Sequence, residues 1–289
     1  MQPVRNALNI PPSSEPTARE TTLCRLLETR DAFDSVAGDY DGPRGNNASI
    51  QDMRAEMWRA LDVTFPPGGR LIDLGCGTGL DAVRMAQQGY AVTATDWSPQ
   101  MVERTRARAT AARLQERVRA LACGAHELSR LEEPGQFDGA YSNLGALNCV
   151  PDLSAVAEQC ARLLKPAGAL VFAVIGRICP WEISHYALRR NWQRIGVRFA
   201  HGMIPVGMNG RVVWTRYYTP LEFYAAFAPL FTLQSCRSLC LLVPPPYIGW
   251  LRDRHLSWYE RLRRIERRVG GWPGLRSMGD HFLMVMRKR

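Results

Sequence analysis

The feature that most constrains this chain is a short apolar strand that runs directly into a glycine-rich turn, Leu71-Ile-Asp-Leu-Gly-Cys-Gly-Thr-Gly-Leu80. The pattern after the turn predicts a helix over residues 81–88, which Gly89 is placed to end. A second strand is predicted over residues 91–95. Strand, helix and strand in this order indicate a parallel βαβ unit of the kind found in nucleotide-binding sheets.

The three glycines of the turn, Gly75, Gly77 and Gly79, indicate a ligand held against the backbone. Without a Cβ atom, the chain can turn tightly and approach a bound group closely. That group would lie over the carboxyl end of the strand, where the next helix begins with free N–H groups. Asp96 ends the second strand, 17 residues after Gly79, and can accept hydrogen bonds from both hydroxyls of a ribose.

The spacing of the glycines separates two cofactor classes. A dinucleotide site has the pattern G-x-G-x-x-G, which seats a pyrophosphate. Here the third glycine comes one place early, and Asp73 precedes the turn. A carboxylate at this point repels a pyrophosphate and suits a cationic ligand that carries an amino group. An NAD-linked enzyme is therefore disfavoured.

The string from Leu71 through Asp96-Trp97-Ser98-Pro99-Gln100-Met101 resembles motif I and its continuation in the class I S-adenosylmethionine (SAM) dependent methyltransferases. The resemblance is specific over residues 66–176 and only topological beyond. It implies SAM as cofactor, S-adenosylhomocysteine as product, and an α/β fold. The expected fold is a Rossmann-like, seven-stranded, mostly parallel sheet with helices on both faces and an antiparallel last strand. The implied cofactor-binding residues are Tyr40, Arg44, Asp73, Gly75, Cys76, Gly77, Thr78, Gly79, Asp96, Trp97, Met101, Ala125, His126 and Asn143.

Several of these residues also have a purely structural interpretation. In the family, a tyrosine placed like Tyr40 covers the methionine part of the cofactor, and an aromatic face over a sulfonium is a cation–π arrangement; packing on the sheet edge is the alternative. Arg44 or Arg54 would pair with the cofactor carboxylate or remain solvated. Trp97 and Met101 would flank the adenine or pack only in the core.

The adenine contact departs from the family pattern. Family members commonly place an acidic side chain just after the third strand, predicted here over residues 118–122. This chain has Ala125 and His126 there, with Glu127 next. The imidazole of His126, the carboxylate of Glu127 and the backbone N–H of Ala125 all remain candidates for the adenine edge.

The segment Asn143-Leu-Gly-Ala-Leu-Asn148 leaves the carboxyl end of a strand predicted over residues 137–142 and should line the site. It lacks the N-P-P-Y form of methyltransferases that act on amino groups of nucleic acid or protein amides. Asn143 and Asn148 are candidates to touch cofactor or substrate, unless one of them only caps a turn.

The rest of the chain divides around this core. Residues 1–20 lack periodicity and are expected to be a disordered arm, with a lid over the ligand as the alternative. Residues 21–289 are predicted to form one domain, with an added cap after strand five and before strand seven. Its parts are an N-terminal helical lid (21–65), a SAM-binding core (66–176), a substrate cap with C-terminal sheet elements (177–280) and a last strand (281–289).

Methyl transfer from SAM is an in-line displacement, so the protein accelerates it mainly by positioning the reacting atoms. A general base is needed only where the nucleophile must lose a proton. His185, with Glu182 on the same helix face, is the candidate catalytic base, although a lone helical histidine is more often structural. Tentative substrate residues are Asn148, Trp181 and Tyr217. The spacing of histidines and cysteines predicts no metal site.

The net charge of +10 is concentrated near the C-terminus, where residues 250–289 carry eleven basic and four acidic side chains. The basic helix predicted within residues 248–268 has three interpretations: a solvated face opposite a core stripe, a surface for anionic membrane lipid, or, least favoured, a nucleic-acid patch. The expected core stripe comprises Leu251, Trp258, Leu262, Ile265 and Val269.

The sequence thus predicts a SAM-dependent methyltransferase that acts on a small apolar or aromatic molecule, without a nucleic-acid partner. The alternatives are a lipid, prenyl or quinone-type acceptor at a membrane surface, and a SAM-binding protein without transferase activity. No run of 18 apolar residues and no signal peptide are present, so a cytoplasmic location is expected. The oligomeric state stays open.

Overall fold

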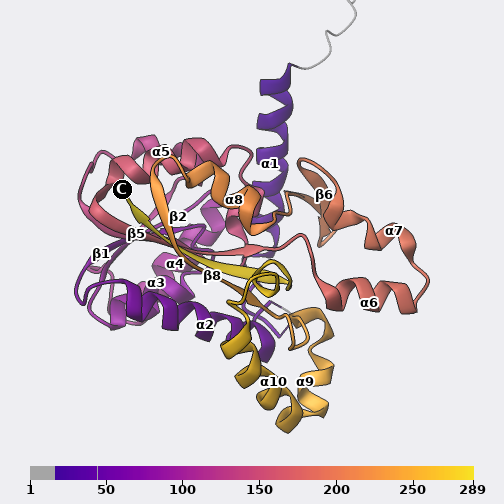
Figure 1. The fold of residues 1–289 in the computed structure, drawn as a ribbon. Helices are drawn as coiled ribbons and strands as arrows, with labels where there is room; N and C mark the ends of the chain where they lie inside the picture. The colour runs from indigo at the N-terminus through magenta and orange to yellow at the C-terminus, as the bar shows by residue number, and fades with distance from the viewer. Residues whose placement is uncertain (1–16, 44) are drawn as a thin grey trace, which may run out of the picture.

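The computed structural model describes residues 17–43 and 45–289. Its centre is a seven-stranded sheet with the strand order β3-β2-β1-β4-β5-β9-β8 (Figure 1). Strands β1 to β5 run parallel, and β9 is antiparallel to both β5 and β8. The predicted fold class and antiparallel last strand are confirmed. The strands are β1 Arg70–Leu74, β2 Ala91–Asp96, β3 Val118–Ala122, β4 Phe137–Ser142, β5 Leu164–Ile175, β8 Phe231–Leu239 and β9 His281–Lys288.

Helices cover both faces of the sheet, and each face has its own apolar core. One core packs α2, α3 and α4 against the sheet, and the other packs α5, α8 and the short turn after β3. The apolar residues of the strands alternate between these two cores, which is why the parallel strands are buried on both sides. The helices of the two layers are α2 Ala48–Thr64, α3 Leu80–Gln87, α4 Pro99–Ala111, α5 Leu153–Leu163 and α8 Pro220–Phe227.

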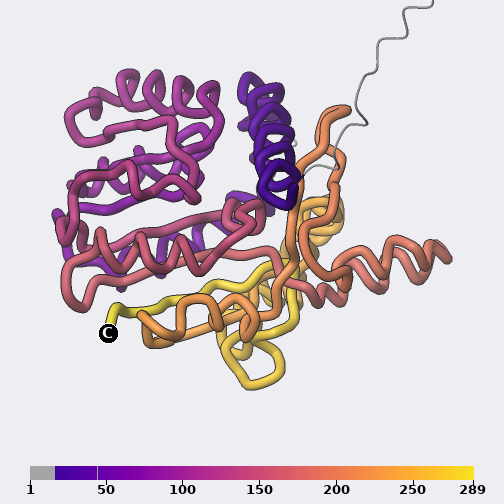
Figure 2. The backbone as a smooth tube through the Cα atoms, turned by 90° about the horizontal axis from the view of Figure 1, so that it is seen from above, coloured from indigo at the N-terminus to yellow at the C-terminus, as the bar shows by residue number. Residues whose placement is uncertain are grey.

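Helix α1 (Ala18–Val36) begins three residues before the predicted start because Thr17 and Glu20 form a reciprocal capping box. Residues 18–20 are therefore helical rather than part of the predicted arm; residues 1–16 of that arm lie outside the described residues. Helix α1 packs against a separate two-stranded hairpin, β6 (Ile204–Met208) and β7 (Arg211–Thr215). The views in Figures 1 and 2 both place α1 beside this hairpin.

A two-residue turn joins β6 and β7, with Asn209 and Gly210 both at positive φ, as such a turn requires. Two helical segments elsewhere in the chain are interrupted. The segment 181–195 divides into α6 (Pro180–Leu188) and α7 (Trp192–Ile195), because Arg190 between them has a φ of 53°. Figure 2 shows this pair projecting from the sheet.

The segment 248–268 is likewise divided into α9 (Trp250–Arg254) and α10 (Leu256–Val269), since His255 has non-helical backbone angles, with φ −135° and ψ 51°. The predicted core stripe of α10 is wrong, because Trp258 and Ile265 are exposed and the buried positions are Tyr259 and Glu266. The remaining short helical turns are η1 Ala125–Arg130, η2 Ala146–Cys149, η3 Val197–Phe199, η4 Pro246–Ile248 and η5 Leu275–Ser277.

Candidate cofactor and acceptor site

A large cavity lies at the carboxyl ends of β1, β2 and β4, with α1 and the β6–β7 hairpin above it. It encloses about 1010 Å³, including the part that opens to solvent. Nine of the predicted cofactor residues line it: Tyr40, Gly75, Gly77, Asp96, Trp97, Met101, Ala125, His126 and Asn143.

The glycine-rich turn brings backbone, rather than side chains, to the cavity wall. Gly77 has a φ of 54°, and a Cβ atom there would point at the Tyr40 ring, 3.8 Å away. A Cβ on Gly75 would lie 2.4 Å from that of Ala146 in the turn after β4. Both positions therefore require glycine. At Gly77 the backbone has a positive φ and faces the cavity, and at Gly75 the turn packs closely against the turn after β4.

Asp96 closes one side of the cavity and is fixed by two backbone donors. Its Oδ2 accepts the Gly77 N–H at 2.9 Å, and its Oδ1 accepts the Ser98 N–H at 2.8 Å. Desolvation raises the pKa of Asp96 to about 6, although both N–H donors act to lower it. Each carboxylate oxygen keeps a lone pair for a ligand.

Trp97, Met101 and Ala125 line the same cavity as Asp96. The rings of Trp97 and His126 meet edge to face, with centroids 4.7 Å apart. Burial lowers the pKa of His126, which keeps the imidazole neutral at pH 7. Glu127 does not line the cavity, since its carboxylate is held within its own turn by the Gly124 N–H and Arg130.

Three predicted cofactor residues around the turn lie behind it instead of lining the cavity. The Cys76 thiol packs against the Thr105 hydroxyl, 3.5 Å away. Thr78 donates its hydroxyl proton to Asp41 at 2.9 Å. Gly79 begins α3 at a φ of 80°. Their contribution is to shape the turn.

Asp73 also departs from expectation, because its side chain is buried in β1 beside Tyr141. Burial, together with the neighbouring Asp81, raises the pKa of Asp73 well above its usual value. The sequence-based expectation of a carboxylate presented to a cationic ligand is therefore not met. Arg44 lies outside the described residues, and Arg54 is buried and does not line the cavity.

Asp81 is a buried hub that the sequence analysis missed. Its carboxylate accepts hydrogen bonds from Arg54 at 2.6 Å, from the Trp58 indole at 2.7 Å and from the Asn143 amide at 3.0 Å. The first turn of α3 places Asp81 here, at a helix end that favours an acid. The hub fixes the orientation of Asn143 in the cavity wall.

The cavity is also lined by Thr29 and Phe33 of α1, by Cys149, and by Val213 and Thr215 of β7. The Trp214 N–H donates to the Thr29 hydroxyl at 3.0 Å and fastens the hairpin to α1. Desolvation raises the pKa of the Cys149 thiol to about 12. The sequence analysis did not predict this part of the lining, because α1 and β7 are about 180 residues apart in the sequence.

The predicted substrate residues Asn148, Trp181 and Tyr217 do not line this cavity, nor does His185. Asn148 is fully buried, where its amide nitrogen donates to the carbonyls of Ile175 and Arg216. It thus joins the end of β5 to the segment after β7, a structural role.

Glu182 does not orient His185, because its carboxylate is bound by Arg198 at 2.6 Å and by the Tyr247 hydroxyl at 3.1 Å. Cys179, Glu182 and Asp280 approach one another closely enough to hold a metal ion. Arg198, however, pairs with both carboxylates, and it holds the pKa of Asp280 far below its usual value despite burial. The protein's own guanidinium thus occupies the place of a cation.

Known proteins are similar to this chain in sequence and in fold. Residues 71–168 match the family model described as a methyltransferase domain. The ubiquinone biosynthesis O-methyltransferase of Xanthomonas campestris is 35% identical over 150 residues, which are 51% of this chain and 60% of that protein. The ubiquinone biosynthesis O-methyltransferase of Xanthomonas oryzae is 34% identical over 151 residues, which are again 51% of this chain and 60% of that protein. The match thus spans about three fifths of the length of these curated relatives.

Solved structures match over most of the chain. A SAM-dependent methyltransferase from Listeria monocytogenes aligns with a TM-score of 0.57 at 17% identity, covering 82% of this chain and 99% of that one. Geranyl diphosphate C-methyltransferase from Streptomyces coelicolor, solved with S-adenosyl-L-homocysteine, aligns with a TM-score of 0.57 at 16% identity, covering 92% and 98%. Residues 71–168 thus match a methyltransferase domain, and the chain shares the fold of known SAM-dependent methyltransferases.

Proposed function

We propose that this protein transfers the methyl group of SAM to a small apolar or aromatic acceptor. The observation that carries the proposal is the position of Asp96. Its carboxylate accepts the Gly77 N–H of the glycine-rich turn, and Asp96 and Trp97 line the same cavity. The cavity thus combines a carboxylate that can accept hydrogen bonds from ribose hydroxyls, a backbone segment that a ligand can approach closely, and apolar side chains. This combination is what a nucleoside cofactor requires.

The cavity residues fit SAM part by part. Asp96 would accept the ribose hydroxyls, and Trp97, Met101 and Ala125 would enclose the adenine. The ring of Tyr40 would cover the methionine part beside Gly77; burial raises its pKa, so it stays a neutral phenol. When bound, the cofactor supplies a sulfonium that makes its methyl group electrophilic.

The acceptor end contains no group suited to remove a proton at neutral pH, among the residues that the structure describes. Asp96 and His126 lie at the ribose and adenine end, while burial keeps Tyr40 and Cys149 protonated. We therefore infer that the acceptor arrives as a ready nucleophile, such as an amine, a thiolate or an acidic phenolate. The protein would contribute positioning, which can supply about 7–11 kcal/mol.

A lipid, prenyl or quinone-type acceptor is a second candidate within this reaction. The apolar lining of Phe33 and Val213 favours it. So do the names of ubiquinone and geranyl diphosphate methyltransferases among the similar proteins. None of the helices in residues 17–43 and 45–289 is long and apolar enough to cross a bilayer. Such an acceptor would be reached by peripheral contact with an anionic membrane, from a proposed cytoplasmic location.

The proposed function is tested by incubating the purified protein with methyl-labelled SAM and an extract of the source cells, followed by separation into organic, aqueous and macromolecular fractions. Label in the organic fraction that is absent with Asp96→Ala supports an apolar acceptor. Label only in the macromolecular fraction contradicts a small-molecule acceptor. If SAM binds but no fraction is labelled, even with quinone and prenyl acceptors added, the protein is a SAM-binding protein without transferase activity.

A further inference from the structure

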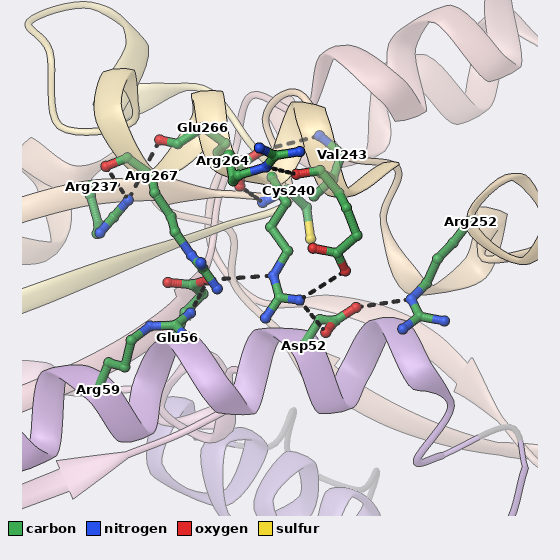
Figure 3. Close-up of polar contacts among 12 residues, drawn as sticks. Asp52, Glu56, Arg59, Arg237, Cys240, Val243, Arg252, Arg264, Glu266 and Arg267 are labelled. Atoms are coloured by element: carbon green, nitrogen blue, oxygen red, sulfur yellow. Dashed lines mark hydrogen bonds and ion pairs between the residues drawn. The ribbon is translucent and has the colours of Figure 1, made fainter. Parts of the chain in front are cut away.

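The C-terminal helices α9 and α10 are mounted rigidly on α2 by a set of ion pairs (Figure 3). Asp52 of α2 pairs with Arg252 at 2.9 Å and with Arg263 at 2.8 Å. One turn further along α2, Glu56 pairs with Arg267 at 2.9 Å. All three arginines are thereby directed toward α2 and are neutralised there.

Glu266 fixes the same helix to the end of β8. Its side chain is buried, and its two oxygens accept the backbone N–H groups of Cys240, Leu242 and Val243 at 2.7 to 3.1 Å. These contacts, also drawn in Figure 3, leave α10 no freedom to rotate about its axis. The face opposite Glu266 must therefore remain turned outward.

The outward face of α10 combines apolar and cationic side chains. Trp258 is 41% exposed and Ile265 is 47% exposed, and their spacing of seven residues puts them on one line along the helix. Arg261, Arg264 and Arg268 form the adjacent line and are exposed. Among the residues that the structure describes, none of these three arginines takes part in an ion pair.

Exposed apolar side chains also occur on the segments that precede and follow α10. Trp250 of α9 and Trp272, which follows α10, are each 59% exposed. Leu256 at the start of α10 is half exposed. Asp253 of α9 is an exposed acid, and it is paired with Arg252. Three exposed tryptophans on these elements thus accompany the three unpaired arginines.

We propose that the outward face of α9, α10 and Trp272 is a docking surface for an anionic phospholipid bilayer. Tryptophan is favoured at the boundary between head groups and acyl chains, and arginine binds the phosphates beside it. A helix with one apolar edge and one cationic edge lies in the plane of such an interface. The unpaired arginines make an anionic lipid surface the charge-complementary occupant.

This surface extends the second acceptor class of the proposed function but does not depend on it, because vesicle binding needs neither cofactor nor acceptor. The test is flotation of the full chain with vesicles of phosphatidylcholine, alone or with phosphatidylglycerol at about one lipid in four. We expect binding to the mixed vesicles that declines as salt is raised. Failure to bind them at low salt overturns the proposal without touching methyl transfer.

Matched variants locate the surface. The triple change Arg261→Gln, Arg264→Gln and Arg268→Gln should weaken vesicle binding at least tenfold. The control triple change Arg104→Gln, Arg113→Gln and Arg117→Gln removes the same charge from exposed positions on α4 and the turn after it. Equal loss in both variants would show a general charge effect and overturn the proposal.

A second readout separates insertion from simple charge attraction. Tryptophan fluorescence should be quenched by lipids brominated on their acyl chains. The change Trp258→Ser with Ile265→Ser should reduce this quenching and weaken binding, while SAM affinity stays unchanged. Quenching that is absent in the wild type, or preferential binding of a DNA or RNA duplex over the mixed vesicles, would contradict a lipid surface.

Discussion

The carboxylate of Asp96 accepts the backbone N–H of Gly77 at 2.9 Å, so the tip of β2 is joined to the turn that follows β1. This bond holds the carboxylate that we propose as the ribose acceptor at a fixed distance from the backbone of the glycine-rich turn. A nucleoside bound by one is thereby brought against the other, which is the pre-organisation that a transfer reaction requires.

A side chain at Gly77 is expected to abolish SAM binding while the fold persists. In Gly77→Val the new atoms enter the cavity beside the Tyr40 ring, and the left-handed backbone adds about 1–2 kcal/mol of strain. Calorimetric titration with SAM measures the loss. Gly68→Val is the control, since Gly68 has a φ of 74°, no neighbour within 4 Å and no place in the cavity. Similar loss in both variants would assign the effect to strain.

SAM affinity should fall as the pH is lowered through about 6, because that is the pKa of Asp96. Below this pH the carboxyl is protonated and loses capacity to accept hydrogen bonds from the ribose. With the ionised form required, affinity at pH 5 is expected to be about tenfold weaker than at pH 7. Asp96→Asn should show weak binding that does not vary over this range. A wild-type affinity constant from pH 5 to 7 contradicts the assignment.

Loss of the Asp81 carboxylate should be among the most destabilising changes in the domain. In Asp81→Ala the buried Arg54 is left without its partner, which costs about 3–5 kcal/mol in the free energy of unfolding. The control is Asp62→Ala, which breaks the more exposed pair with Arg84 and should cost about 1 kcal/mol or less. Urea denaturation measures both, and equal costs would remove Asp81 as the hub.

The change His185→Ala should leave turnover and SAM affinity within about twofold of the wild type, as expected of a surface substitution. His185 does not line the cavity, and the carboxylate expected to orient it is bound elsewhere. Turnover is measured with labelled SAM and the acceptor recovered from the organic fraction. A loss of a hundredfold in kcat with unchanged SAM binding would restore His185 as a catalytic base.

The parts that the sequence predicted well are those specified locally. The order of strand, glycine turn and helix places Gly75, Gly77 and Asp96 at one edge of the sheet through short-range rules alone. These local rules did not predict that the side chain of Asp73 is buried. Its position in the motif is local, but the burial that raises its pKa comes from Tyr141 and Asp81 on neighbouring elements.

The parts that the sequence did not predict depend on distant contacts. The backbone N–H of Trp214 binds the Thr29 hydroxyl although 185 positions separate the two residues. No periodicity in either segment therefore predicts that α1 and β7 line the proposed acceptor site. In α10, apolar periodicity pointed to Trp258 and Ile265 as core. Partners on other elements instead buried Glu266, which left the apolar residues outside.

The central claim is that the cavity at the ends of β1 and β2 binds SAM through Asp96, and calorimetric titration of wild type and Asp96→Ala with SAM tests it most directly. Each charge-assisted hydrogen bond lost should contribute about 1.5–3 kcal/mol. We therefore predict saturable one-to-one binding by the wild type and an affinity at least about tenfold weaker in the variant. Equal affinity in both proteins, or no binding of SAM by the wild type, would contradict the account.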